Sequence, residues 1–398
     1  MNNPDEIIRI AAKGDGVTGD GRHVARAAPG DVVQTDGSLK HGPHHIEPPC
    51  KHFGKCGGCE LQHADEGALR EFVRSRVANA AEGQGIDFAE LLPTHLSPPK
   101  SRRRAILHAM NANGKPQIGF RAAGSHKIVG LTQCHILAPE LFAIVEAIRP
   151  ILARRKGRYL IDIDVTLVDQ GVDCSLKNMT IEGLQQTEEI LDFAKDNSLA
   201  RVSLDQGYGP ETMWEPEPVS VTLSGVPVGF PSGGFLQATR DGEDVLVGDA
   251  KSWLGDAKII ADLFSGLGTF AFALADNSKI LAAEAARDAH LACKMAAGVS
   301  RRPVHPIHQD LFRNPLQVEE LNKFDAVLLD PPRAGARDQA ELLAGSSVER
   351  IVYISCNPSS WARDAKRLVE SGYRLKKLRP VGQFRWSTHV ELTSLFIR

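Results

Sequence analysis

The feature that most constrains the fold lies in the C-terminal third of the chain, where short apolar runs alternate with segments of helical character. The apolar runs are residues 259–263, 280–283, 324–329, 350–354 and, at the very end, 390–397. Continuous apolar runs are typical of parallel strands, because helices cover both faces of a parallel sheet. Strands that alternate with helices predict a doubly wound α/β sheet. The composition changes near residue 230, so we expect this domain to occupy residues 231–398.

One of these runs ends in a polar turn that carries a cysteine. Residues 351–354 are followed by Ser355, Cys356, Asn357 and Pro358. Proline disfavours helical geometry in the residue before it, so the turn opens where the strand ends. Ligands bind at the carboxyl ends of strands in open α/β sheets, and a thiol there is placed to act as a nucleophile. The alternative interpretation is that Cys356 is a small buried apolar residue, as free cysteines often are.

Composition describes an ordinary globular protein. The chain has 398 residues, enough for two or three domains, with 42% hydrophobic and 24% charged residues. No apolar run is long enough to span a bilayer and no secretory signal is visible, so we expect a cytoplasmic protein with reduced cysteines. The net charge of −2 does not indicate nucleic-acid binding by the whole surface, so any such contact must come from local basic patches.

The N-terminal part divides into two regions. Residues 1–47 carry short β-like pieces separated by Gly-rich turns and predict a small β unit. We interpret His41, His44 and His45 as part of a solvated linker rather than as metal ligands. Residues 48–230 form the second region, in which residues 61–90 have helical periodicity and alternating segments from about residue 100 onward predict a mostly antiparallel β domain.

Three cysteines lie close together at the start of this second region. They are Cys50, Cys56 and Cys59, and glycines at positions 54, 57 and 58 allow the tight turns that bring three sulfurs to one centre. Cys134 is the best candidate for a fourth thiolate. Zinc and iron–sulfur clusters both accept four cysteinates, and the spacing does not separate them. The remaining isolated cysteines, Cys174 and Cys293, are interpreted as packing residues.

Basic residues of the second region offer candidate RNA contacts. Arg102, Arg103 and Arg104 are consecutive, and Arg121 and Lys127 follow nearby. Cations in this arrangement can bind phosphates. A solvated strand face explains them equally well.

A glycine-containing loop, residues 262–270, follows the first strand of the expected α/β sheet. Its two glycines let the backbone pass close to a ligand before a helix begins. Glu284, about twenty residues further on, ends the second strand and is placed to accept hydrogen bonds from two ribose hydroxyls. Asp310 closes the third strand, where it could meet an adenine edge. Since the full dinucleotide pattern is absent, these residues suit S-adenosylmethionine better than NAD, although either acid alone could be a helix cap.

A rigid acidic loop follows the fourth strand. Asp330 precedes Pro331, Pro332 and Arg333. The two prolines restrict the backbone, and the carboxylate can accept a hydrogen bond from a base N–H. We expect this loop to hold a planar base rather than to be only a turn.

Together these motifs resemble the S-adenosylmethionine-dependent RNA uracil-5-methyltransferases, in particular the iron–sulfur branch that acts on 23S ribosomal RNA. The resemblance covers nearly the whole chain. It rests on six motifs in family order, namely the four cysteines Cys50, Cys56, Cys59 and Cys134, then Phe235-Leu236-Gln237, the 262–268 loop, Asp330-Pro-Pro-Arg, Ser355-Cys-Asn-Pro and His389-Val-Glu391.

The resemblance implies a role for each matching residue. Cys356 would be the nucleophile and Glu391 the base that removes the uracil C5 proton. The cofactor and base site would be lined by Gln237, Phe264, Thr269, Glu284, Asp310 and Asp330. The four cysteines would hold a [4Fe–4S] cluster, with zinc as the alternative. The expected architecture is then a Rossmann-like class I methyltransferase domain, a β-rich RNA-binding central domain with the cluster, and a short TRAM-like or OB-like unit over residues 1–47.

The chain departs from the family pattern at two positions that bear on substrate choice. Thr239 stands where the family often has Asn, and Arg385 follows Phe384 where Pro is usual. The expected substrate is 23S rRNA, with transfer RNA as the alternative, and no obligate protein partner is expected. Two further alternatives stay open, an RNA cytosine-5-methyltransferase and a non-catalytic metal-binding RNA module.

Overall fold

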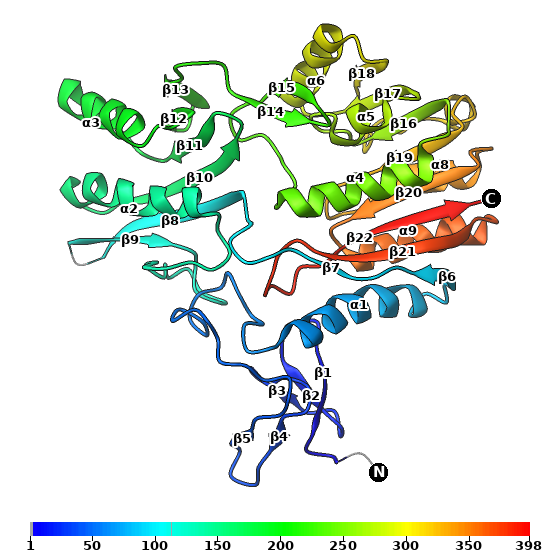
Figure 1. The fold of residues 1–398 in the computed structure, drawn as a ribbon. Helices are drawn as coiled ribbons and strands as arrows, with labels where there is room; N and C mark the ends of the chain where they lie inside the picture. Colours follow the sequence, from blue (N-terminus) through cyan, green and yellow to red (C-terminus); the bar gives the residue numbers. More distant parts are fainter. Residues whose placement is uncertain (1–2, 113) are drawn as a thin grey trace. The chain divides into compact units, whose positions relative to one another are not determined.

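The computed structural model describes residues 3–112 and 114–398, which form two compact units (Figure 1). The first unit contains the chain up to Phe72, then Ser97–Ser220 and the short segment Phe384–Thr388. The second unit contains Val73–Leu96, Val221–Gln383 and His389–Arg398. Each unit is therefore assembled from separate stretches of the chain.

The first unit begins with short antiparallel strands. The strands β1 (Ile7–Ile10), β2 (Gly16–Thr18) and β3 (His23–Val24) form one sheet, and β4 (Val32–Val33) pairs with β5 (Leu39–Lys40). All of these strands lie within the stretch for which the sequence predicts a small β unit.

One of the three histidines after β5, which were predicted to lie in a solvated linker, is held in the fold. His45 is largely buried and its Nδ1 lies 2.7 Å from Oδ2 of the fully buried Asp31. His41 stacks on His45 with 3.6 Å between the ring centroids, and Nδ1 of His44 lies 2.9 Å from Oδ2 of Asp65. The linker interpretation is therefore wrong for His45, whereas His41 and His44 have exposed side chains.

A larger sheet follows in the first unit, with the strand order β13-β12-β11-β10-β8-β9. Its strands are β8 (Arg104–Ala112), β9 (Lys115–Gly119), β10 (Leu160–Val168), β11 (Gly171–Lys177), β12 (Arg201–Asp205) and β13 (Pro210–Trp214). Helix α2 (Pro139–Arg154) packs its apolar stripe on this sheet. Most pairs are antiparallel, as expected, but β11 and β12 are parallel because helix α3 (Gly183–Asp196) connects them.

The second unit is built on a sheet with the order β18-β17-β16-β19-β20-β22-β21-β6, and β7 also pairs with β21. The strands are β6 (Phe88–Leu91), β7 (His95–Leu96), β16 (Ile259–Leu263), β17 (Lys279–Glu284), β18 (Val304–His308), β19 (Ala326–Leu329), β20 (Arg350–Ser355), β21 (Arg374–Gly382) and β22 (Glu391–Ile397). The strands from β16 to β20 pair in parallel, while β22 runs antiparallel to both of its neighbours. The predicted parallel sheet is confirmed.

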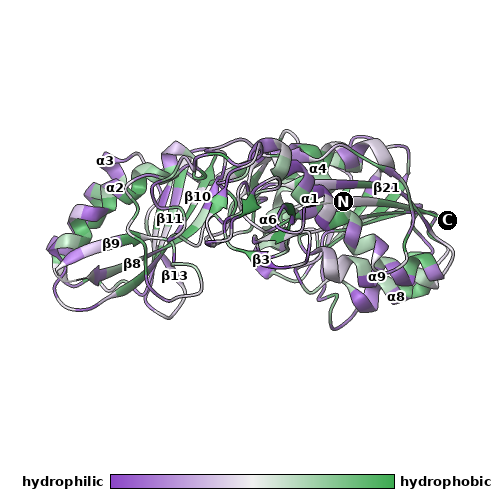
Figure 2. Cartoon of the chain, turned by 90° about the horizontal axis from the view of Figure 1, so that it is seen from below, coloured by the Kyte–Doolittle hydropathy of each residue, from purple (hydrophilic) through white to green (hydrophobic). Residues whose placement is uncertain are grey.

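Helices of the second unit alternate with its strands. They are α4 (Arg240–Leu254), α5 (Thr269–Leu274), α6 (Arg287–Ser300), α7 (Val318–Leu321), α8 (Arg337–Ala344) and α9 (Pro358–Glu370), preceded by the hairpin of β14 (Ser220–Leu223) and β15 (Val226–Gly229). Helix α9 carries both hydrophilic and hydrophobic stretches, as its one-sided burial requires (Figure 2). Within residues 3–112 and 114–398, no helix is long and apolar enough to cross a membrane.

The helix predicted over residues 61–90 is shorter than expected. Helix α1 spans Glu66–Glu82 and is followed by strand β6. Gly83 lies just past the helix, and Gly85 adopts a positive φ of 69°, a conformation that favours glycine. These glycines end the helix, and the chain then adds an edge strand to the sheet of the second unit.

Candidate active site

Strand direction brings Asp330 and the two predicted reacting side chains, Cys356 and Glu391, to one edge of the sheet. Asp330 directly follows β19, Cys356 directly follows β20, and Glu391 is the first residue of β22. Strand β20 lies between the other two, parallel to β19 and antiparallel to β22. The carboxyl ends of β19 and β20 and the amino end of β22 therefore share an edge, which the sequence pattern alone could not establish.

The turn that carries Cys356 is held by its neighbours. Asn357 has an extended backbone (φ −144°, ψ 99°), and its side chain accepts a hydrogen bond from the Ser359 amide at 3.1 Å, which caps α9. Its Nδ2 also donates to the carbonyl of Arg333 at 2.9 Å. The predicted opening of the turn before Pro358 is confirmed. Cys356 itself is half-buried, so the thiol is not a core residue.

Burial dominates the acid–base behaviour of the two carboxyl groups. It raises the pKa of Asp330 from 3.8 to about 7. It also raises the pKa of Glu391 from 4.5 to about 8, and the charge of Asp330 adds to this effect. Desolvation and a neighbouring like charge both disfavour an ionised carboxylate. Near neutral pH the pair therefore retains protons that exposed carboxyl groups would lose.

The thiol responds to the same surroundings. Burial raises the pKa of Cys356 to about 11, with further contributions from Glu391 and Asp330, while the Arg333 guanidinium acts in the opposite direction. The three groups thus interact electrostatically in one site. Near neutral pH the Cys356 thiol therefore keeps its proton, whereas the reactive form of a cysteine is the thiolate.

Two buried amides join the carboxyl groups, and only one of them was anticipated. Gln237 donates from Nε2 to Oδ2 of Asp330 at 3.2 Å and accepts a hydrogen bond from Nε2 of Gln383 at 3.0 Å. The same Nε2 of Gln383 also donates to Oε2 of Glu391. Gln383 directly follows strand β21, which ends at Gly382, and no motif in the sequence marks it.

A second unanticipated contact lies beside Cys356. The guanidinium of Arg333 is 3.0 Å from Nδ1 of His389, two residues before Glu391. The carbonyl of Arg333 also accepts a hydrogen bond from the hydroxyl of Ser360 at 3.0 Å. The Asp330-Pro-Pro-Arg loop is therefore fixed to the start of α9 and to the segment that leads into β22.

The loop after β16 has the geometry of a nucleoside cradle. Gly266 and Gly268 have positive φ values of 55° and 91°. A Cβ at Gly266 would meet nothing within 4 Å, so this side of the loop is open, whereas one at Gly268 would lie 2.9 Å from Sγ of Cys293. The carboxylate of Glu284 accepts hydrogen bonds from the amides of Gly266 at 2.8 Å and Ala286 at 2.6 Å.

The chemistry of the residues around this loop fits an adenosine group. The Phe264 ring lies 5.4 Å from the ring of Phe312 at an angle of 52°. Asp310 accepts a hydrogen bond from the Phe312 amide at 3.0 Å, so its carboxylate is fixed close to these rings. With the acceptor oxygens of Glu284, this set offers apolar faces for a base and acceptors for hydroxyl groups.

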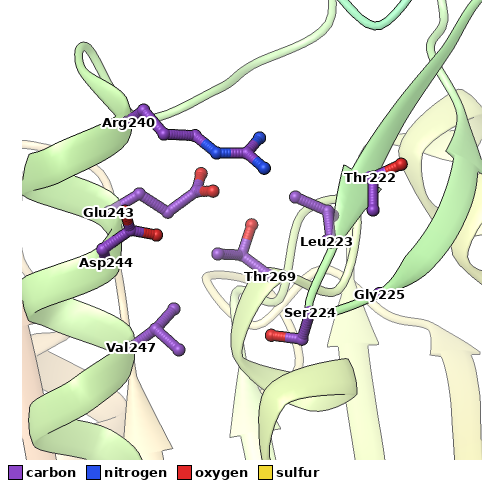
Figure 3. Close-up of a pocket in the computed structure, with 9 residues that line it drawn as sticks. All are labelled: Thr222, Leu223, Ser224, Gly225, Arg240, Glu243, Asp244, Val247 and Thr269. Carbon is purple, nitrogen blue, oxygen red and sulfur yellow. The ribbon is translucent and has the colours of Figure 1, made fainter.

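Thr269, another expected cofactor residue, lines a pocket of about 160 Å³ in the second unit. The other walls are the turn of the β14–β15 hairpin and the first turns of α4. Figure 3 shows the Arg240 guanidinium and the Glu243 carboxylate extending from α4 toward the Thr269 hydroxyl. The pocket thus presents a cation, an anion and a hydroxyl beside the start of α5.

The four cysteines of the expected metal site gather in the first unit. Burial raises the pKa of Cys56, Cys59 and Cys134. The charge of at least one other cysteine among the four, Cys50 included, raises each of these pKa values further. At Gly57 a Cβ would lie 2.9 Å from the Arg121 carbonyl oxygen, so only glycine fits where these two backbone segments meet. Across residues 3–112 and 114–398, no group of three or more His, Cys, Asp or Glu side chains is arranged to hold a metal ion.

Arg102 and Arg103, two of the three consecutive arginines between Cys59 and Cys134, pack against the protein instead of extending into solvent. Arg102 lies over the rings of Phe120 at 5.8 Å and Phe384 at 5.2 Å, and Arg103 is buried. Neither the solvated strand face nor a simple phosphate grip describes these two residues. Arg121 and Lys127 are exposed, so phosphate contact stays a prediction for these two residues.

Comparison with known proteins places these features in context. A family model described as tRNA (uracil-5-)-methyltransferase matches residues 312–398, the part that contains Asp330, Cys356 and Glu391. An uncharacterized RNA methyltransferase of Zymomonas mobilis is 49% identical, with 99% of each chain covered. The 23S rRNA (uracil(1939)-C(5))-methyltransferase RlmD of Chromohalobacter salexigens is 29% identical over 99% of this chain and 83% of its own length.

A solved structure shows the same fold. The tRNA (uracil-54, C5)-methyltransferase of Pyrococcus abyssi, in complex with S-adenosyl-L-homocysteine, has a TM-score of 0.76 to this chain. The two share 23% sequence identity, and the match covers 98% of each chain. The mixed α/β methyltransferase fold predicted from the sequence is thus confirmed.

Proposed function

Because the chain belongs to the RNA uracil-5-methyltransferase family, we propose that it transfers a methyl group from S-adenosylmethionine to carbon 5 of one uridine in 23S rRNA. The observation that carries this proposal is the shared sheet edge at which Cys356, Asp330 and Glu391 interact electrostatically. Transfer RNA is the second candidate substrate, because the family model and the Pyrococcus structure are both named for transfer RNA enzymes.

The chemistry of uracil explains why a thiol and a carboxylate are needed together. Carbon 5 is a weak nucleophile, but addition of the Cys356 thiolate to carbon 6 makes an enolate whose carbon 5 can attack a methyl group. The cofactor supplies that methyl group on a sulfonium. Glu391 then takes the C5 proton, the C5–C6 double bond re-forms and the thiolate leaves. Asp330, held by Gln237, is placed to accept a hydrogen bond from a base N–H.

The base has to be extruded for this reaction. A thiolate reaches carbon 6 only from above the ring plane, which neighbouring bases cover in a stacked helix. A loop or a single-stranded segment of RNA is therefore the expected target, as in most sequence-specific RNA recognition.

Two substitutions test the proposed chemistry. Glu391→Gln keeps the shape of the side chain but cannot accept a proton, so the enzyme should accumulate as a covalent complex with RNA that survives denaturation. Cys356→Ala should form neither the complex nor product. Denaturing gels with ribosomal and transfer RNA from a host strain without this gene are the measurement. A fully active Cys356→Ala protein would disprove the nucleophile.

The same RNA identifies the target and separates the alternatives. Mass spectrometry of digested RNA should show 5-methyluridine that is missing from ribosomal RNA of the strain without the gene. Methylated cytidine would favour the cytosine-5 alternative. If 5-methyluridine were lost from transfer RNA alone, transfer RNA and not 23S rRNA would be the substrate. A protein that does not bind S-adenosylmethionine, with or without Glu284→Ala, would be a non-catalytic RNA module.

We also propose that Cys50, Cys56, Cys59 and Cys134 hold a [4Fe–4S] cluster. The support is chemical, since all four donors are thiols that interact with one another. A cluster holds its thiolates around several metal atoms and sulfides, so the sulfurs lie further apart than around one ion. The purified protein should be brown and contain iron and sulfide. A colourless protein with stoichiometric zinc would contradict this assignment.

A further inference from the structure

We propose that Gln383 is a positioning residue that holds the Glu391 carboxylate in the orientation needed to take the uracil C5 proton. The inference rests on the proposed function and adds a residue that none of the sequence motifs contains. Gln383 is 2% exposed and Glu391 is 7% exposed, so both side chains are fixed inside the second unit.

The hydrogen bonds of Gln383 define which way its amide points. The backbone N–H of Thr239 donates to Oε1 of Gln383 at 3.3 Å. A backbone N–H can only donate, so the oxygen of the side-chain amide must face Thr239 and the NH₂ group must face the other way. That NH₂ group donates to Oε1 of Gln237 at 3.0 Å and to Oε2 of Glu391.

The chain of donors continues to the second carboxyl group. Gln237, oriented by the bond from Gln383, donates its own Nε2 to Asp330 at 3.2 Å. Each of the two carboxyl groups thus accepts a hydrogen bond from a side-chain amide N–H, a group that can only donate. Such a donor favours the ionised carboxylate, and the amide bonds accordingly lower the pKa of Asp330 and of Glu391 against the larger effect of burial. Only the ionised form of Glu391 can accept the C5 proton.

Helix α4 supports this arrangement sterically. A Cβ on Gly242 would lie 2.4 Å from Cγ and 2.7 Å from Cδ of Gln383, so only glycine admits the side chain. Thr239 caps the same helix by accepting a hydrogen bond from the Gly242 amide at 3.1 Å. Thr is therefore a competent substitute for Asn at this position, since both residues cap helices.

Gln383 acts through Glu391 rather than on the substrate. Its amide is surrounded by Thr239, Gln237 and Glu391, and its polar atoms are used in these bonds. A glutamate side chain with free torsions would seldom face the proton it must remove, and small misplacements of a catalytic group are costly. The amide removes that freedom.

The test uses the full protein with saturating S-adenosylmethionine and ribosomal and transfer RNA from a strain without the gene. Gln383→Met keeps the length of the side chain and removes its hydrogen bonds. Gly242→Ala displaces Gln383 without removing a polar atom. Gly248→Ala, in the same helix, is the matched control, because its Cβ would meet nothing within 4 Å.

We expect Gln383→Met and Gly242→Ala to accumulate the denaturation-resistant RNA complex, with elimination slowed by roughly tenfold to a hundredfold, as for loss of a hydrogen bond to a charged group. The pH at half-maximal elimination should rise in Gln383→Met, since the donor that favours ionised Glu391 is gone. Gly248→Ala should match the unaltered protein. A purely structural role would lower the yield of active protein without moving this pH midpoint.

The outcomes separate this inference from the proposed function. If Glu391→Gln traps the complex while Gln383→Met shows normal complex levels and a normal pH midpoint, the inference is wrong and the function stands. If Gln383→Met does not fold, Gly242→Ala decides by the same two readouts. If Glu391→Gln traps nothing and Cys356→Ala is active, the proposed function itself is wrong.

Discussion

At the scale of residues, the site holds two carboxyl groups whose ionisation burial disfavours, and their charges in turn disfavour ionisation of the Cys356 thiol. Burial and like charge hold Cys356, Asp330 and Glu391 toward their neutral forms. The proposed reaction would need Cys356 and Glu391 ionised at successive steps. In the free site, both groups therefore keep their protons near neutral pH.

This arrangement predicts how stability depends on pH. The folded-state pKa values of Asp330 and Glu391, about 7 and about 8, exceed their ordinary values of 3.8 and 4.5. Between these limits the folded protein binds more protons than the unfolded chain, so the free energy of unfolding falls as pH rises. The contribution is fully present below about pH 4 and lost above about pH 8.

Thermal unfolding of the protein and of an Asp330→Asn/Glu391→Gln double variant checks this expectation. The melting temperature of the unaltered protein, relative to the variant, should fall between pH 5 and pH 9. The difference isolates the two carboxyl groups from other titrating residues such as His63, whose pKa burial lowers to about 4. A difference that is flat or rises with pH would contradict the assigned direction.

At the scale of elements, the sequence analysis succeeded where local pattern and tertiary role agree. The strands at 259–263 and 350–354 were predicted because both faces of a parallel strand are buried and the apolar run is continuous. Strand β6 was missed because its burial pattern of half-exposed ends and exposed centre gives no apolar run. Only its pairing with β21 makes it a strand.

The candidate site shows the same limit. Cys356, Asp330 and Glu391 follow or begin apolar runs, so their positions at strand ends were predictable. Gln383 was not predictable, because its role depends on the approach of α4 at Gly242, and a buried glutamine has no periodic signature. The three predicted residues are marked by the local sequence pattern, whereas Gln383 is recognised only by its contacts in the folded chain.

The cap of helix α9 gives a prediction at this scale. Asn357→Ala removes the oxygen that caps α9 and should lower the free energy of unfolding by about 0.5–2 kcal/mol. Asn357→Asp keeps a capping oxygen but loses the donor to the Arg333 carbonyl. In urea unfolding, the Asn357→Asp variant should therefore be more stable than the Asn357→Ala variant. Formation of the RNA complex should be impaired in both variants. Equal stability of the two variants would refute the capping role.

At the scale of the whole molecule, the charge is close to balanced, with a net value of −2. RNA binding then depends on local cations. Arg121 and Lys127 lie on a turn whose backbone bonds to the cysteine loop, with Gly57 N donating to the Arg121 carbonyl at 2.9 Å and Ala123 N to that of Lys55 at 3.4 Å. The four-cysteine site thus supports a basic turn that the sequence analysis had treated separately.

Salt dependence of RNA binding tests this turn. Arg121→Ala and Lys127→Ala should each weaken binding to all RNAs alike and reduce the slope of log affinity against log salt by roughly one. Lys195→Ala, an exposed lysine of α3, is the control and should leave the slope unchanged. If the slope is unaltered in the Arg121 and Lys127 variants, phosphate contacts lie elsewhere.

The segment Phe384–Thr388 limits how parts of this chain can be exchanged with those of relatives. The chain belongs to the second unit up to Gln383, to the first unit over these residues, and to the second unit again from His389, just before Glu391. Neither unit is a continuous stretch of polypeptide, so no single cut yields two self-sufficient fragments. Replacing one unit by the corresponding part of a relative would therefore need exchanges at several points of the chain.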